Sequence, residues 1–159
     1  KVFPKFNASV DMEKREIIHK KYVNLGVAVS TDRGLVVPVI RDADRKNMVE
    51  VAAEISQIAQ KARDGTLDVT DMQGGTFTVT NLGRFGGAYF TPVINYPEVA
   101  ILGMGRAYSQ AGVNGGADRT VLPLSLSFDH RVIDGAEGAK FLGWLTEAIQ
   151  QPLILALEG

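Results

Sequence analysis

Residues 125–135 read SLSFDHRVIDG, an alternating stretch that runs into a cluster of charge and then a glycine. Serine and apolar side chains alternate up to Phe128, which predicts a β-strand with two different faces. A helical pattern begins at Ala136, so the polar residues between them occupy the corner from strand to helix. His130, one of two histidines in the chain, therefore lies where functional side chains often gather.

The remaining sequence predicts an α/β fold with a mixed set of strands and two helices. Apolar residues spaced three and four apart predict helices over Asn47–Arg63 and Ala136–Gln150. The inner face of the second helix is expected to consist of Ala139, Phe141, Leu142, Leu145, Ala148 and Ile149. Asn47 begins a capping-box pattern, and Gly65 follows the end of the first helix. Runs rich in β-branched residues predict strands at 24–30, 34–40, 76–81, 99–104 and 121–128.

Three smaller features complete this prediction. The polar segment 11–21 is typical of an exposed hairpin or connection. Pro38 indicates a sheet edge or a bulge. The glycine-rich residues 82–98 predict a long loop, and loops of that length usually have a functional or packing reason.

Composition excludes several classes of protein. With 159 residues, 45% of them hydrophobic, the chain is long enough for one core and we expect a single domain. A net charge of −1 gives no basic footprint for nucleic acid or an anionic membrane, and no apolar run approaches a bilayer-spanning length. There is no cysteine, so any thiol chemistry must use a thiol of the substrate.

Other site types fit poorly. The strand before Gly103-Met104-Gly105 suggests a dinucleotide-binding loop, but Tyr108 stands where the third glycine is needed, which favours a structural turn. A metal site needs at least three ligands, and His130 with Asp134 supplies two, so we expect no metal. The G-x-S-x-G elbow of serine hydrolases is absent.

The corner at His130 allows two interpretations from the residues alone. A single histidine in a turn is more often a satisfied structural residue than a catalytic one. Histidine side chains ordinarily titrate near pH 6.5, which suits a general base at neutral pH. A buried carboxylate at Asp134 would hold the surroundings by binding a cation or backbone amides, and this favours the general base.

The residues of this corner carry a resemblance to a known family. HRVIDG after LPLSLSFD resembles the H-x-x-x-D-G signature of the catalytic domains of dihydrolipoamide acyltransferases, which are core components of 2-oxo acid dehydrogenase complexes, and of chloramphenicol acetyltransferase. Residues 22–48, 72–87 and 90–107 resemble consecutive blocks of the same domain in the same order. The resemblance covers essentially the whole chain.

The resemblance implies a fold and a domain organisation. We expect a chloramphenicol acetyltransferase-like fold, an α+β sandwich in which helices flank a mixed sheet, as one catalytic domain over residues 1–159. Family catalytic domains are usually longer, so we expect the N-terminal helical part that helps form the coenzyme A side of the channel to be missing here. No lipoyl or peripheral-subunit-binding domain is recognisable in this sequence.

The resemblance also implies a reaction and its residues. An acyl group, acetyl by similarity to the pyruvate complexes, would pass directly between the thiols of dihydrolipoamide and coenzyme A. His130 would be the general base and Thr80 would donate a hydrogen bond to the oxyanion. Asp134 would support the corner, and Gly135 would allow the tight turn into the helix. The alternatives are succinyl or branched-chain acyl transfer, chloramphenicol acetylation, and a non-catalytic core protein of the same fold.

The same resemblance implies partners and a location. We expect trimers in which the histidine of one subunit faces the hydroxyl of the next, assembled into a cubic or dodecahedral core. Lipoyl domains, the 2-oxo acid decarboxylase and dihydrolipoamide dehydrogenase would be the partners. The apolar end LILALEG either packs on its own domain or, as the resemblance favours, makes contacts between trimers. The expected location is the bacterial cytoplasm, or the mitochondrial matrix in a eukaryote.

Overall fold

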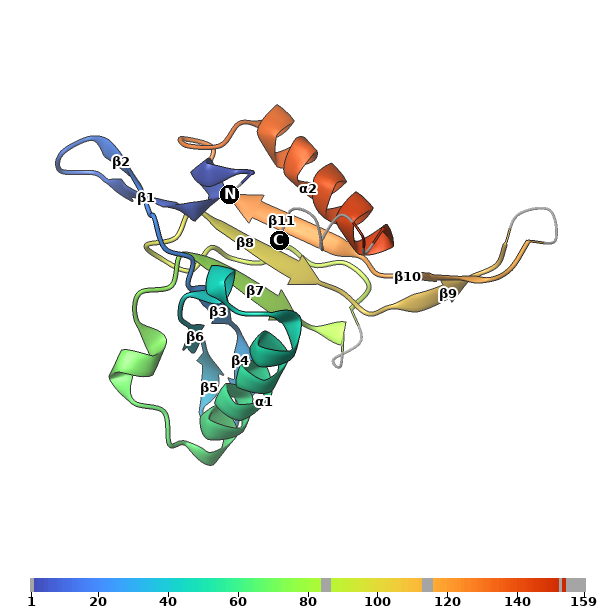
Figure 1. Cartoon of the computed structure of the whole chain (residues 1–159), viewed down its shortest axis with the longest axis horizontal. Coiled ribbons are helices and arrows are strands. Elements are labelled where there is room, and N and C mark those ends of the chain that lie inside the picture. Colours follow the sequence, from blue (N-terminus) through green and yellow to red (C-terminus); the bar gives the residue numbers. More distant parts are fainter. Residues whose placement is uncertain (1, 84–86, 113–115, 152, 154–159) are drawn as a thin grey trace.

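A five-stranded mixed sheet forms the centre of the molecule in a computed structural model, which describes residues 2–83, 87–112, 116–151 and 153 (Figure 1). The three middle strands run parallel, and the two outer strands run antiparallel to their neighbours. In sheet order, the strands are β11 (Leu124–Phe128), β8 (Ala100–Met104), β7 (Phe77–Asn81), β3 (Leu25–Val27) and β6 (Val39–Ile40).

Three two-stranded hairpins surround this sheet. Two of them project from opposite sides of the body in Figure 1, namely β1–β2 and β9–β10. The hairpin predicted for residues 11–21 is confirmed and begins slightly earlier, because β1 and β2 pair antiparallel across the turn at residues 12–15. The bounds are β1 (Ala8–Asp11) with β2 (Glu16–His19), β4 (Val29–Thr31) with β5 (Gly34–Val36), and β9 (Tyr108–Gln110) with β10 (Arg119–Val121).

Both predicted helices are present, α1 (Met48–Asp64) and α2 (Gly135–Gln150). In α1 the Asn47 side chain accepts from the amides of Val49 and Glu50, and Gly65 ends the helix in the left-handed region at φ 69°. Short 3₁₀ turns span Pro4–Asn7 (η1), Ala43–Arg45 (η2) and Val69–Met72 (η3). No helix among the described residues is long and apolar enough to cross a bilayer.

The main core lies between α2, the first turn of the chain and the β8–β11 side of the sheet. The rings of Phe6 and Phe141 stack with centroids 4.4 Å apart, which attaches η1 to α2. One turn earlier in α2, Gly138 lies so close to Phe128 that an added Cβ would come within 2.7 Å of the ring. The fully or largely buried members are Phe6, Ala8, Val99, Ala100, Val132 and Ile133.

Three of the predicted strands are shorter than the sequence pattern indicates. The run 24–30 divides between β3 and β4, and the run 34–40 divides at Pro38, which is the bulge or edge position that its missing amide predicts. Residues 121–128 divide at Pro123, so β10 and β11 belong to different sheets. In each case the apolar pattern continues through a point where the backbone changes direction. Hydrophobicity alone does not predict such a change.

Candidate active site

The corner after β11 is held by backbone hydrogen bonds around Asp129. Its amide donates to the carbonyl of Val99, at 2.8 Å, which ties the corner to the start of β8. Its carbonyl accepts from the amides of Val132 and Ile133, both at 3.0 Å, and these two side chains are buried. His130 is thus an exposed residue at the outside of a turn whose base is anchored in the core.

Asp129 and Arg131 form an ion pair that spans His130 in the sequence. The guanidinium Nε donates to Asp129 Oδ1 at 2.9 Å, and the Arg131 amide donates to the same oxygen at 3.0 Å. These hydrogen bonds, with the positive charge, lower the pKa of the Asp129 carboxyl below its usual value. Since the Arg131 side chain is 60% exposed, the pair fixes geometry more than it stabilises the fold. This pair was not predicted from the sequence, although opposite charges two positions apart in Asp129-His130-Arg131 indicate it.

The imidazole of His130 has an apolar neighbour on one side and is otherwise exposed. Its ring centroid lies 5.7 Å from that of Phe128, with the planes inclined by 41°. No side chain or backbone group of the described residues makes a hydrogen bond to it. An imidazole placed this way keeps its ring nitrogens available for a proton of a bound molecule.

Asp134 caps helix α2 rather than contacting the imidazole directly. Its Oδ1 accepts from the Glu137 amide at 2.8 Å, and the Glu137 carboxylate accepts from the Asp134 amide at 3.3 Å. The Glu137 amide is the main cause that lowers the pKa of Asp134, with smaller electrostatic effects of Lys5 and His130. The expectation of a buried carboxylate is wrong: Asp134 is exposed, because a helix cap needs only the free amides of the first turn.

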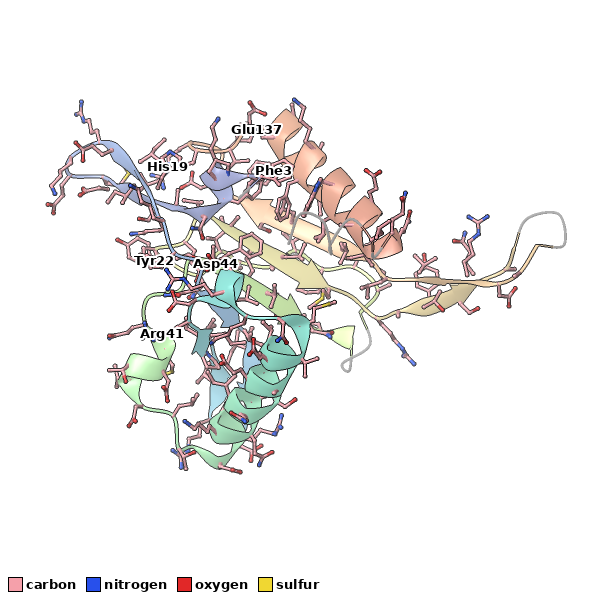
Figure 2. The ribbon with its side chains drawn as sticks, in the orientation of Figure 1. Phe3, His19, Tyr22, Arg41, Asp44 and Glu137 are labelled. Atoms are coloured by element: carbon pink, nitrogen blue, oxygen red, sulfur yellow. The ribbon has the colours of Figure 1, made fainter. Side chains whose placement is uncertain are left out.

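A basic residue from the start of the chain extends this cap. Lys5, in η1, pairs with Glu137 at 2.8 Å, and Figure 2 shows Glu137 at the beginning of α2. The lysine also makes the surroundings of the Asp134 carboxylate more positive. The H-x-x-x-D-G corner is therefore joined to the first turn of the chain by a charged contact on the surface.

Thr80 lies at the other end of the sheet. It is the fourth residue of β7, is half-buried, and pairs with Gly103 of β8. Gly103 has no side chain because the ring of Phe90 fills that space, where an added Cβ would approach to 2.8 Å. The chain turns after this strand, with the Gly83 amide donating to the Asn81 side chain at 2.8 Å.

One chain does not bring Thr80 and His130 together. Strand β11 runs antiparallel to β7 and β8, as Figure 1 shows, and Phe128 pairs with Ala100 whereas Thr80 pairs with Gly103. His130 follows Phe128 by two residues, so the two side chains are about five positions apart along the sheet, roughly 17 Å at 3.3 Å per residue. A site that uses both needs a second copy of the chain.

The glycines of Gly103-Met104-Gly105 serve packing rather than nucleotide binding. A Cβ on Gly105 would lie 1.9 Å from the Ala88 carbonyl oxygen, and its amide donates to the Pro123 carbonyl at 2.9 Å. Gly103 and Met104 lie in β8, so the structural turn that the sequence favours is not formed at these residues.

Two further features of the molecule bear on the site. No group of three or more histidine, aspartate or glutamate side chains suited to a metal ion occurs among residues 2–83, 87–112, 116–151 and 153. A groove of about 520 Å³ lies between β10, the start of β11 and the last turns of α2, lined by residues such as Arg119, Leu142 and Ile149. It contains neither His130 nor Thr80 and does not define the candidate site.

Comparison with known proteins gives the family. Residues 1–157 match the model of the 2-oxoacid dehydrogenases acyltransferase catalytic domain. The chain belongs to this acyltransferase family. It is 48% identical over 161 aligned residues to the dihydrolipoyllysine-residue acetyltransferase component of the pyruvate dehydrogenase complex of Staphylococcus aureus. All of the chain is covered, but it spans only 37% of that relative's length.

Solved structures of acyltransferases agree with the fold. The dihydrolipoamide acetyltransferase of Azotobacter vinelandii matches 95% of this chain and 63% of its own, with 47% identity and a TM-score of 0.88. In that protein the catalytic roles of a serine, and of a histidine and an asparagine four positions apart, have been investigated. A structure of the cubic core of the pyruvate dehydrogenase multienzyme complex matches with 46% identity over 95% of this chain and 63% of its own, at a TM-score of 0.87.

A more distant likeness extends to chloramphenicol acetyltransferase. That structure matches 86% of this acyltransferase chain and 65% of its own, with a TM-score of 0.56 at 16% identity, which shows the fold alone. Together these structures confirm the predicted class, a mixed sheet with flanking helices of the chloramphenicol acetyltransferase type.

Proposed function

We propose that this chain catalyses acetyl transfer between dihydrolipoamide and coenzyme A in the core of a pyruvate dehydrogenase complex. The observation that carries the proposal is the anchored corner that presents His130 outward, in a chain whose family transfers acyl groups. Acetyl is favoured over other acyl groups by the 48% identity to an acetyltransferase component of that complex.

His130 acts as the general base. It removes the proton from the attacking thiol, the sulfur adds to the thioester carbonyl carbon, and the negative charge moves to the carbonyl oxygen. Collapse of this adduct breaks the old carbon–sulfur bond, and the imidazolium returns the proton to the departing sulfur. General-base catalysis of this kind contributes typically 10²–10⁴-fold. No cysteine of this chain can compete with the substrate thiol as the nucleophile, since the sequence contains none.

Thr80 stabilises the oxyanion. A hydroxyl on a strand inside a sheet is held by its neighbours, and so it is aimed before charge develops. Asp134 and the Asp129–Arg131 pair support the reaction through the backbone of the corner, since they fix the turn and the helix start on either side of His130. Neither group exchanges a proton with substrate in this mechanism.

The active site lies between two subunits. Because Thr80 and His130 occupy opposite ends of one sheet, we assign the base to one subunit and the hydroxyl to its neighbour. A closed ring of three subunits then has three equivalent sites. Coenzyme A and the lipoyl group, both substrates here, enter from opposite sides of this interface.

Larger assembly and partners follow from the same proposal. Trimers assemble into a multimeric core, for which the similarity to a cubic pyruvate dehydrogenase core is the support. Lipoyl domains, the 2-oxo acid decarboxylase and dihydrolipoamide dehydrogenase work with that core. We place this core in the bacterial cytoplasm or in the mitochondrial matrix. The lack of cysteine suits a reducing compartment of this kind. Six of the seven residues of the apolar end, expected to contact other trimers, lie outside the described residues.

Mixing two inactive variants tests the function and the shared site together. His130→Ala and Thr80→Ala subunits are each expected to be nearly inactive in acetyl transfer from acetyl-CoA to dihydrolipoamide. After unfolding and refolding as an equal mixture, about one quarter of the interfaces combine an intact histidine with an intact hydroxyl. Activity near that fraction of wild type is expected.

The controls separate the possible failures of this experiment. Each variant refolded alone gives the background, and wild type refolded alone gives the yield. No recovery in the mixture, with normal trimers by light scattering, refutes a site shared between subunits. A wild-type chain that transfers succinyl faster than acetyl refutes the acyl assignment.

A further inference from the structure

A buried carboxyl group lies at the start of β8. Glu98 is 6% exposed and precedes Val99, the residue whose carbonyl holds the His130 corner. Its Oε1 accepts from the side-chain amide of Asn95 at 3.3 Å. Its Oε2 is buried and has no hydrogen-bond partner among the described residues. Glutamate is almost never buried in this way without a specific partner.

A second buried oxygen lies on the neighbouring strand. Thr78, in β7, is fully buried, and its hydroxyl also makes no standard hydrogen bond to a described residue. The same hydroxyl is one of the two polar groups that act on the pKa of Glu98, so the two side chains face each other. Each buried oxygen left without a partner is costly to the fold. One hydrogen bond between them satisfies both.

Two glycines provide the space for this pair. A Cβ on Gly75 would lie 2.5 Å from Glu98 Oε1, and a Cβ on Gly26 would lie 2.5 Å from Thr78 Oγ1. Neither glycine has a positive φ, so backbone conformation does not require them. The carboxyl and the hydroxyl therefore occupy room that two neighbouring segments leave open.

The surroundings disfavour a negative charge. Burial raises the pKa of Glu98, and the hydrogen-bonding groups of Thr78 and Asn95 oppose this only in part. No charged side chain of the described residues contributes to the shift. The guanidinium of Arg41 lies against Gly74, but it donates to backbone carbonyls of η3 and the residue after it. A carboxylate at this position would have no counter-charge.

We propose that Glu98 works as a neutral acid that positions the active site, donating a hydrogen bond from its carboxyl group to Thr78 Oγ1. The bond joins the start of β8, to which the Asp129 amide and hence His130 are tied, to β7, where Thr80 follows Thr78 on the same face. Glu98 thus connects β7, which carries Thr80, with the start of β8, to which the His130 corner is tied. The catalytic part of this inference rests on the proposed acyl transfer, but the protonation of Glu98 does not.

Infrared difference spectroscopy on the full chain tests the protonation without any assay of activity. The wild-type spectrum minus the Glu98→Gln spectrum is expected to show the carbonyl band of a protonated carboxylic acid at a pH just above the ordinary pKa of glutamate, where exposed glutamates are ionised. That band should vanish as the pH rises through the raised pKa of Glu98. Wild type minus Glu13→Gln, which alters an exposed glutamate, should show only a carboxylate. Absence of the acid band in the first difference overturns the proposal.

The pH dependence of acetyl transfer tests the positioning role. Glu98→Gln keeps a neutral hydrogen-bond donor, so its kcat should stay within about twofold of wild type at pH values where Glu98 is protonated. It should lose the decline in kcat that ionisation of Glu98 causes at higher pH. Glu98→Ala should lower kcat by about 10–100-fold with KM little changed, because small displacements of a catalytic group have effects of that size. Unchanged kcat in Glu98→Ala overturns the positioning role.

A second variant covers the case in which Glu98→Ala does not fold. Thr78→Val keeps the shape of the side chain and removes the acceptor, so the acid band should move to the frequency of a carboxylic acid without that hydrogen bond. An unmoved band overturns the Glu98–Thr78 bond. If wild type shows the acid band but transfers no acetyl group, the proposed function is refuted. The proposal that Glu98 is protonated is then still supported.

Discussion

The two ends of the central sheet carry the two halves of the candidate site, and they are built differently. At the end with His130, an ion pair, a capped helix and three backbone hydrogen bonds fix the turn, and the imidazole itself is exposed. At the end with Thr80, the functional group sits within a strand and is positioned by its neighbours in the sheet.

This difference reflects the chemistry proposed for each group. A base that moves a proton has to reach the substrate, so it stands on a corner with open space in front of it. An oxyanion donor has to be aimed in advance, so it belongs in a rigid element. The comparison predicts that removing the exposed imidazole acts on catalysis alone, whereas changes inside the sheet act on fold and catalysis together.

The largest effect is expected from His130→Ala. Removing the base should lower kcat of acetyl transfer by about 10²–10⁴-fold, with little change in thermal stability, since the side chain is exposed. The matched control is His19→Ala, on the exposed strand β2, shown in Figure 2. Steady-state kinetics and a melting curve measure both. Equal loss in the two variants would break the assignment of the base.

The Thr80 end is tested next. Thr80→Ala should lower kcat by about 10²–10³-fold, the usual effect of losing one oxyanion donor, while Thr80→Ser keeps the hydroxyl and most of the rate. Thr70→Ala, at an exposed position of η3, is the control. If Thr80→Ser falls as far as Thr80→Ala, the hydroxyl is not the working group, and packing in the strand explains the loss.

Two glycines of α2 separate packing from helix propensity at the His130 end. Gly138→Ala brings a Cβ against Phe128, and overpacking of this kind costs about 1–3 kcal/mol, more than the roughly 0.5–1 kcal/mol gained by replacing a helical glycine. Gly143→Ala meets no atom within 4 Å and should gain stability. Urea unfolding compares them. A shifted Phe128 also moves its neighbour His130, so kcat should fall only in Gly138→Ala.

The smallest effect concerns the cap of α2. The pKa of Asp134 is lowered, so its carboxylate contributes stability that is present above the unfolded pKa and is lost as the pH falls through the folded pKa. Asp134→Asn keeps a good cap that does not titrate and should flatten the loss of stability below about pH 4. Asp134→Ala removes the cap at every pH. Melting temperatures from pH 3 to 7 measure this, and identical pH profiles would contradict the role.

Local sequence rules predicted the elements with strong local signals. Helix α1 matches its predicted range to within a residue at each end, because Asn47 and Gly65 mark both ends. The corner at His130 was also located correctly, since strand alternation stops at Phe128 and a cap follows. Such features are decided by residues within a few positions of one another.

Features that depend on packing between distant segments were not predictable. Four of the six residues predicted for the inner face of α2 are buried or half-buried, but Ala139 and Ile149 are exposed, because the face that meets the core is centred on Gly138 and Ala148. Gly135 was expected to allow a tight turn, yet its backbone has no positive φ and an added Cβ would meet nothing. Glu98 is of a residue type that is usually exposed, yet it lies in the core, because segments distant in the sequence bury it only in the folded protein.

The parallel centre of the sheet has a consequence for the order of folding. The hairpins β1–β2, β4–β5 and β9–β10 close over short stretches of chain and can form within microseconds. Pairing β3 with β7 joins residues about fifty positions apart, and such non-local contacts slow folding. In pulse-labelled hydrogen exchange, amides of the hairpins should gain protection before those of β7. The strand that carries Thr80 and Thr78 is then among the last parts to take its final form.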